Sequence, residues 1–243
     1  MPNQLTILCA MQPEADAIIA ALELTKTNTP WPTNLPPKLW SHPDHPLTLV
    51  TNGHDPRTNA NLIGITPATY ATQLLINHLN PSCLLIAGAA GGDSASTSIG
   101  QTFLIDQAYH HDRRIPLPEF AHYAHGPEPL HAPQSIDLPT ATISTGNALD
   151  TLPHELDFFK AHNSTVKDME TASIAWTASL HQTKAIAIRS ITDFYDHPTP
   201  ETQFLNNFDL ALTNLAQAIK SNLPALLAEC CEEITAKNTP VNQ

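Results

Sequence analysis

Three carboxylates follow segments that the sequence predicts to be β-strands. Glu14 comes after the apolar run 5–10, Glu170 after residues 165–168, and Asp193 after residues 185–191. In open α/β sheets, ligands bind in the crevice outside the carboxyl ends of the strands, so residues that are remote in sequence can meet there. We therefore expect one acidic site that is suited to proton transfer.

Each of these carboxylates also has a purely structural explanation. A glutamate in the first turn of a helix, as we expect for Glu14 and Glu170, interacts favourably with the helix dipole. Asp193 precedes Phe194 and Tyr195, and an aspartate there could stabilise a turn through its own backbone. The catalytic interpretation therefore depends on all three carboxylates occurring together at strand ends.

The strands expected around these residues alternate with helices. Strands are predicted at residues 5–10, 47–51, 83–87, 103–109, 140–144, 165–168 and 185–191, and helices at 13–22, 67–78, 154–161, 170–181 and 204–226. This alternation predicts a three-layer α/β/α fold with a mostly parallel central sheet. The glycine-rich stretch 88–92 is expected to form a turn, and the proline-rich stretches 28–46 and 115–139 to be irregular.

Length and charge limit the class of protein. The chain has 243 residues and a formal net charge of −12, which suits one α/β domain, expected at 1–230, with a frayed tail at 231–243. Nucleic-acid affinity comes mainly from clustered Lys and Arg, so no nucleic-acid partner is expected. The N-terminal apolar run is far shorter than the roughly 18 residues of a membrane span, and it has no charged signal region. We therefore predict a cytoplasmic protein.

Cysteine and histidine do not form a recognisable metal or disulfide pattern. The four cysteines lack C-x-x-C spacing and are expected to be reduced thiols. Among the thirteen histidines there are close pairs at 42 and 45, 110 and 111, and 122 and 125. None has an acidic partner at helical spacing, so we predict neither a metal nor a cofactor.

Five motifs carry a resemblance to a known family. Residues 10–14, 87–92, 144–147, 168–170 and 189–193 resemble, in order and spacing, the 5′-methylthioadenosine/S-adenosylhomocysteine nucleosidases of the nucleoside phosphorylase superfamily. Segments 63–68, 111–116 and 144–150 are similar to the plant-type methylthioadenosine nucleosidases in particular. The resemblance implies a nucleoside phosphorylase/hydrolase-like fold and hydrolysis of an adenine nucleoside, either methylthioadenosine or also S-adenosylhomocysteine.

The resemblance also implies roles for individual residues. Cleavage of the N-glycosidic bond turns the ribose into an oxocarbenium-like cation and places negative charge on the purine. Asp193 would protonate the purine at N7, Glu14 would act as general base on water, and Glu170 would bind the ribose hydroxyls. Arg189 would help to place the water or fix a carboxylate. The other substrate-binding residues implied are Met11, Ala89, Gly91, Leu149 and Met169.

The sequence leaves two alternative functions open. A phosphorylase would use phosphate in place of water and would need several donors around that anion, whereas Arg189 is the only cation of a matching site motif. A non-catalytic nucleoside-binding module is suggested by Ala89, since related enzymes carry a hydroxyl residue there. Retention of Glu14 and Asp193 favours an enzyme. The resemblance further implies a homodimer in which segment 110–120 of one subunit borders the pocket of the other.

Overall fold

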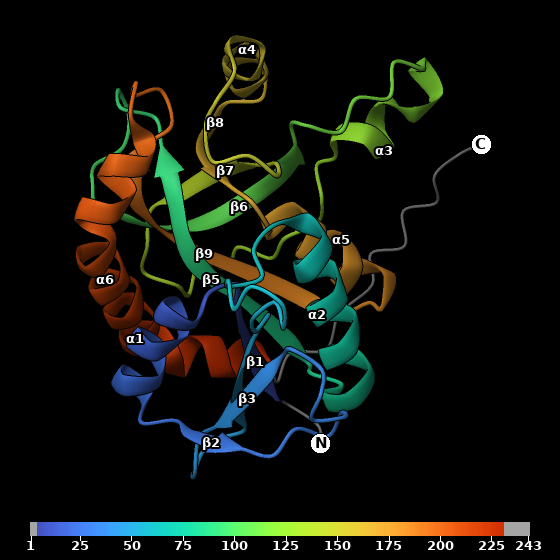
Figure 1. The fold of residues 1–243 in the computed structure, drawn as a ribbon, viewed down its shortest axis with the longest axis vertical. Helices are drawn as coiled ribbons and strands as arrows, with labels where there is room; N and C mark the ends of the chain where they lie inside the picture. Colours follow the sequence, from blue (N-terminus) through green and yellow to red (C-terminus); the bar gives the residue numbers. More distant parts are fainter. Residues whose placement is uncertain (1–3, 231–243) are drawn as a thin grey trace.

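Residues 4–230, which are the residues that the computed structural model describes, form nine strands and six α-helices (Figure 1). The strands are β1 (Leu5–Cys9), β2 (Thr25–Thr27), β3 (Lys38–Ser41), β4 (Leu47–Thr51), β5 (Cys83–Gly92), β6 (Thr102–His110), β7 (Thr140–Thr145), β8 (Ser164–Asp168) and β9 (Lys184–Phe194). The helices are α1 (Gln12–Leu22), α2 (Ile65–Leu79), α3 (Ala121–His125), α4 (Pro153–Ala161), α5 (Thr171–Leu180) and α6 (Pro200–Glu229), and a 3-10 helix spans Pro118–Phe120. The tail predicted at 231–243 lies outside the described residues.

The strands form one mixed sheet in the order β2-β3-β4-β1-β5-β8-β7-β6-β9. Strand β9 also pairs with β5, so β5, β8, β7, β6 and β9 close into a ring. The α/β class is confirmed, but a mostly parallel sheet is not, because β2–β3, β3–β4, β5–β8 and β6–β9 are antiparallel. The connections from β2 to β3 and from β3 to β4 contain no helix, and parallel neighbours need a long crossover connection, so these pairs are antiparallel.

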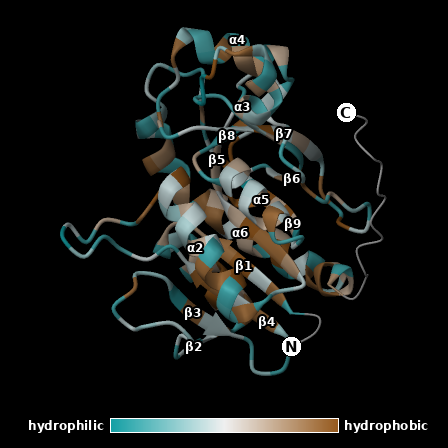
Figure 2. Ribbon diagram, turned by 90° about the vertical axis from the view of Figure 1, so that its right-hand side faces the viewer, coloured by the Kyte–Doolittle hydropathy of each residue, from teal (hydrophilic) through white to brown (hydrophobic). Residues whose placement is uncertain are grey.

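Helices cover both faces of the sheet, and the alternation of side chains along the strands explains why. In β1, Leu5, Ile7 and Cys9 belong to the apolar cluster that includes α1 and α6, whereas Leu8 belongs to the cluster that includes α2 and α5. Successive strand residues point to opposite faces, so an all-apolar strand needs helices on both sides. Figure 2 shows hydrophobic residues concentrated in central strands such as β1 and β9.

The glycine-rich stretch 88–92 is part of a strand, so the predicted turn is wrong. Strand β5 continues to Gly92 and pairs with β9 as far as Phe194, which places Asp193 within β9 and not after it. The glycines admit close neighbours: a Cβ atom at Gly88 would lie 2.3 Å from Arg189 Nη1, and one at Gly92 would lie 2.1 Å from Thr97 Oγ1. Close approach, and not chain reversal, explains their positions.

The two proline-rich stretches differ in order. Stretch 28–46 is irregular only in part, because β3 forms within it and its Leu39 and Trp40 are buried in the core. Stretch 115–139 is largely irregular and contains only the 3-10 helix and α3. Helices α3 and α4 lie at the same end of the molecule (Figures 1 and 2).

Candidate active site

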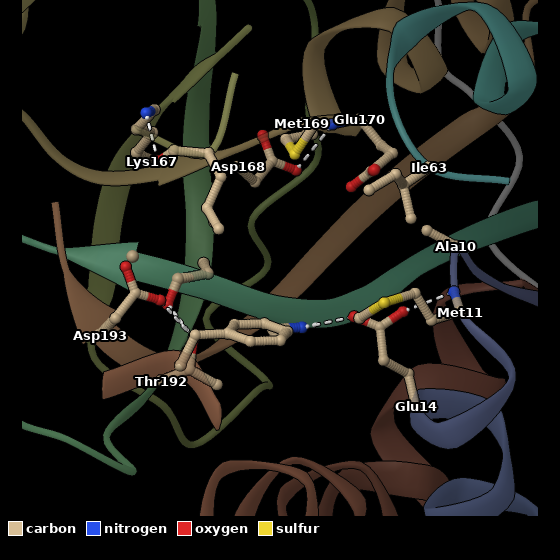
Figure 3. Close-up of a pocket in the computed structure, with 15 residues that line it drawn as sticks. Ala10, Met11, Glu14, Ile63, Lys167, Asp168, Met169, Glu170, Thr192 and Asp193 are labelled. Atoms are coloured by element: carbon tan, nitrogen blue, oxygen red, sulfur yellow. Dashed lines mark hydrogen bonds between the residues drawn. The ribbon is translucent and has the colours of Figure 1, made fainter. Parts of the chain in front are cut away.

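A pocket of about 210 Å³ opens where β1, β5, β8 and β9 approach their carboxyl ends. Eight of the nine predicted site residues line it: Met11, Glu14, Ala89, Gly91, Leu149, Met169, Glu170 and Asp193. Figure 3 shows Glu14 and Asp193 in different parts of this pocket, reached from α1 and β9 respectively. The residues predicted from strand ends therefore do converge, although they are far apart in the sequence.

Glu14 is held by backbone amides on both carboxylate oxygens. The amide of Met11 donates to Oε2 over 2.9 Å, and the amide of Ala89 donates to Oε1 over 2.8 Å. The Met11 contact caps the start of α1, whose first turn also contains Pro13. Burial raises the pKa of Glu14, while nearby Arg189 and the two amides oppose that rise. Glu14 thus lies in the first turn of α1, as the sequence suggested. In this position its carboxylate also faces the pocket.

Asp193 is buried on β9, with an exposed fraction of 2%. The hydroxyl of Thr192 donates to its Oδ1 over 2.7 Å. Burial raises the pKa of Asp193, and the neighbouring Lys167 ammonium acts in the opposite direction. Gly91 leaves the space beside it, since a Cβ atom there would lie 3.0 Å from Asp193 Oδ2. A buried carboxyl with a raised pKa holds its proton to higher pH, as a general acid requires.

Glu170 faces the pocket from the residue before α5. The amide of Gly64 donates to its Oε1 over 2.8 Å, and Arg189 Nη2 lies 3.6 Å from its Oε2. Burial raises the pKa of Glu170 to about 7, with Asp168 and Glu14 adding to the rise and Arg189 opposing it. This carboxylate can accept hydrogen bonds from a ligand that enters the pocket.

Arg189 is the predicted site residue that does not line the pocket. Its guanidinium donates to Asp168 Oδ2 over 2.5 Å and to Thr171 Oγ1 over 3.0 and 2.9 Å. A further bond of 3.3 Å reaches the carbonyl of Ala89. Arg189 therefore partly neutralises the buried acids, and four hydrogen bonds hold its guanidinium to protein partners.

Two charged residues of β8, Lys167 and Asp168, also line the pocket and were not predicted as site residues. Both are buried, and Asp168 accepts hydrogen bonds from Thr145, Thr171 and Arg189. The signal in the sequence was a lysine and an aspartate next to each other at the end of a short strand that is largely buried. Ile63 and Phe204 complete the apolar part of the wall.

Ala89 contributes its backbone to the site. A serine or threonine hydroxyl is missing there, but the amide still binds Glu14 and the carbonyl still binds Arg189. The placement of both residues thus does not depend on the side chain at position 89.

The remaining polar groups give no sign of a metal. Within residues 4–230, no group of three or more His, Cys, Asp or Glu side chains is arranged to hold an ion. Cys9, Cys83 and Cys230 are free and buried. None of the helices in the described part of the chain has both the length and the apolar character that crossing a bilayer requires.

Comparison with known proteins agrees with this geometry. Residues 4–224 match the Phosphorylase superfamily. The chain is 29% identical over 243 residues to a 5′-methylthioadenosine/S-adenosylhomocysteine nucleosidase of Arabidopsis thaliana, covering 96% of this chain and 95% of that relative. It is 30% identical over 222 residues to a 5′-methylthioadenosine nucleosidase of the same plant, covering 88% and 83% of the two chains.

Solved structures give the same answer for the fold. The apo structure of Arabidopsis thaliana 5′-methylthioadenosine nucleosidase superimposes on this chain with a TM-score of 0.89. The two chains are 27% identical, and the match covers 94% of this chain and 100% of that chain. The chain belongs to the phosphorylase superfamily. The resemblance to its 5′-methylthioadenosine/S-adenosylhomocysteine nucleosidases, first seen in five motifs, is confirmed.

Proposed function

We propose that this protein hydrolyses the N-glycosidic bond of 5′-methylthioadenosine, releasing adenine and 5-methylthioribose. One observation carries the proposal: two buried carboxyls with raised pKa values, Glu14 and Asp193, face a single pocket from different elements. Pairs of titratable groups in different environments are how one site provides both an acid and a base. The relatives, which are nucleosidases, support the same reaction.

The surroundings of the two carboxyls suit opposite roles. Glu14 accepts two amide hydrogen bonds and is close to Arg189, and both features favour its ionised, basic form. Asp193 accepts a hydrogen bond from a hydroxyl, and burial, the largest effect on its pKa, favours its protonated form. In the proposed reaction, Asp193 donates its proton to N7 of adenine, and Glu14 removes a proton from the water that attacks the anomeric carbon. Glu170 binds the ribose hydroxyls.

The charges around the pocket favour water over phosphate as the acceptor. Four hydrogen bonds hold Arg189 to Asp168, Thr171 and Ala89. The ammonium of Lys167 is likewise engaged, with residues 149–151. A phosphate would thus face several carboxylates without a free cation, and burying an uncompensated anion is costly. This argument also disfavours the phosphorylase alternative.

We further propose that the protein acts as a homodimer in the cytoplasm. Leu117, Phe120 and Tyr123 are 49%, 42% and 52% exposed, which leaves large apolar side chains uncovered in segment 115–123. Contiguous exposed apolar groups mark interaction sites, and a second copy of the chain would cover them. The free buried thiols suit a reducing compartment.

One assay tests the proposal against its alternatives. Purified protein is incubated with methylthioadenosine in phosphate-free buffer, and adenine and free sugar are measured. Hydrolysis gives both products without phosphate, a phosphorylase gives methylthioribose 1-phosphate only when phosphate is added, and a binding module gives neither. Size-exclusion chromatography with light scattering measures the oligomeric state separately.

A further inference from the structure

Glu170 receives one of its hydrogen bonds from a turn in a distant part of the chain. The amide of Gly64 donates to its Oε1 over 2.8 Å, although the two residues are 106 positions apart. Figure 3 shows the Glu170 carboxylate beside Ile63, the residue before Gly64. Gly64 has a φ of 96°, in the left-handed region that glycine adopts readily. Whatever holds this turn in place therefore also affects the carboxylate.

The turn is held from outside by Asn147. The first amides of a helix have no partner within the helix, and Gly64, at the N-cap of α2, has no side chain to supply one. Asn147 Oδ1 accepts the amide of Ile65 over 3.0 Å instead. The same oxygen packs against the turn, since a Cβ atom at Gly64 would lie 2.9 Å from it. Asn147 thus contacts the turn on both sides of the Gly64 carbonyl.

Asp112 in turn holds Asn147. Strands β6 and β7 are parallel neighbours, and their last residues, His110 and Thr145, lie opposite each other. Asp112 and Asn147 each come two residues later, so both emerge at the same edge of the sheet. Asp112 Oδ2 accepts the backbone amide of Asn147 over 2.8 Å and its side-chain amide over 3.3 Å. With its side-chain nitrogen bound to Asp112, Asn147 directs its side-chain oxygen at α2.

We propose that Asn147, held by Asp112, is a positioning residue for ribose binding: it keeps the Gly64 amide on the carboxylate of Glu170. The proposal rests on the proposed function, in which Glu170 binds the ribose hydroxyls. Asn147 is not among the residues that line the pocket, so it acts on the carboxylate through Gly64. The amide orients Glu170 and favours its ionised form, which is the form that accepts hydrogen bonds from hydroxyls.

The pH dependence of kcat/KM distinguishes this role from a merely structural one. The charged groups that face Glu170 from the neighbouring elements are Arg189 on β9, Asp168 on β8 and Glu14 on α1. The substitution Asn147→Ala changes none of them. Loss of the Gly64 donor should raise the pKa of Glu170 further, so the decline in activity toward low pH should begin at a higher pH. A hydrogen bond to a charged group is strong enough for a shift of about one pH unit.

We expect Asn147→Ala to move the decline upward by at least about half a pH unit. Asn77→Ala is the matched control, because Asn77 is an exposed asparagine on α2, and it should leave the pH profile unchanged. In a Glu170→Gln background, Asn147→Ala should cause no further shift, because the group on which it acts no longer ionises. A shift no larger than that of the control, or one that persists without Glu170, would overturn the proposal.

Hydrogen exchange measured by NMR tests the same contact without turnover. In Asn147→Ala the Gly64 amide should exchange at least about fivefold faster than in wild type, and in Asn77→Ala at the wild-type rate. If Asn147→Ala does not fold, Asp112→Ala removes the support of Asn147 and should change the exchange and the pH profile in the same directions. Absence of wild-type hydrolysis would contradict the proposed function, whereas unchanged exchange of the Gly64 amide would contradict the role of Asn147.

Discussion

Asp168 and Arg189 form a buried ion pair behind the pocket, with 2.5 Å between Asp168 Oδ2 and Arg189 Nη2. The pair, together with bonds to Thr171 and Ala89, directs most of the N–H donors of Arg189 to protein partners and away from a bound anion. It also keeps a positive charge close to Glu14 and Glu170, since Arg189 opposes the rise in pKa of both. The arginine therefore supports the carboxylates electrostatically and not by contact with the ligand cavity.

Removal of one partner of this pair should destabilise the protein. Asp168→Asn leaves the Arg189 charge buried with weaker compensation, and we expect the free energy of unfolding to fall by about 3 kcal/mol. Urea denaturation followed by circular dichroism measures the change. Asp16→Asn is the control, because Asp16 is exposed on α1. A loss no larger than that of the control would contradict the assigned role of the pair.

Asp193→Asn tests the proton donor. Asparagine keeps the size and the hydrogen bond from Thr192 but cannot protonate N7, so we expect kcat to fall by at least about a hundredfold while methylthioadenosine still binds. Asp196→Asn, an exposed position shortly after Asp193, should retain normal turnover. Near-normal turnover of Asp193→Asn would mean that another group supplies the proton.

Glu14→Gln tests the general base. Glutamine has one oxygen for the two amides of Met11 and Ala89, and it cannot accept a proton from water. We expect a folded protein that binds methylthioadenosine but hydrolyses it at least about a hundredfold more slowly, with no rescue by added phosphate. Single-turnover release of adenine is the measurement, and Glu23→Gln is the exposed control. Formation of methylthioribose 1-phosphate as the main product would contradict the proposed hydrolysis and indicate phosphorolysis.

Activity should decline as the pH is lowered through about 7, the value to which burial raises the pKa of Glu170. Below this pH the carboxylate becomes protonated and loses an acceptor for the ribose hydroxyls. Glu14 also has a raised pKa and must be ionised, so it reinforces the decline. Measuring kcat/KM over a series of pH values shows where this decline occurs. Glu170→Gln should lower kcat/KM, and the decline in activity that remains should occur at a lower pH. If the decline stays at the same pH, another group is responsible for it.

The wall of the pocket predicts a preference between two nucleosides. Met11, Ile63, Leu149 and Phe204 are apolar, which suits a methylthio group better than the zwitterionic tail of S-adenosylhomocysteine, because buried charges need partners. We expect methylthioadenosine to be preferred at least about tenfold in kcat/KM, or roughly 1.4 kcal/mol. Parallel kinetics on both nucleosides measure the preference. Equal efficiency would show that the pocket is open at its 5′ end.

Much of the fold could be predicted from the sequence, because apolar runs such as 5–10 and 83–87 have few alternatives to buried strands. Glycines such as those at 88–92 suit both turns and close approaches, and only the tertiary structure, with Arg189, Asp193 and Thr97 packed against them, distinguishes the two. The three carboxylates singled out in the sequence lie around one pocket in the structure. The burial of Lys167 could not be predicted, because it depends on acceptors in a segment that has no sequence pattern of its own.

The closed ring of β5, β8, β7, β6 and β9 affects how this protein meets other chains. A ring leaves no unpaired strand, so within residues 4–230 the sheet ends only at β2, Thr25–Thr27. This border is three residues long and includes the exposed Lys26. Short, charged borders resist the addition of a foreign strand. The same closure that brings β5 and β9 together around the pocket therefore also protects the protein against strand-to-strand aggregation.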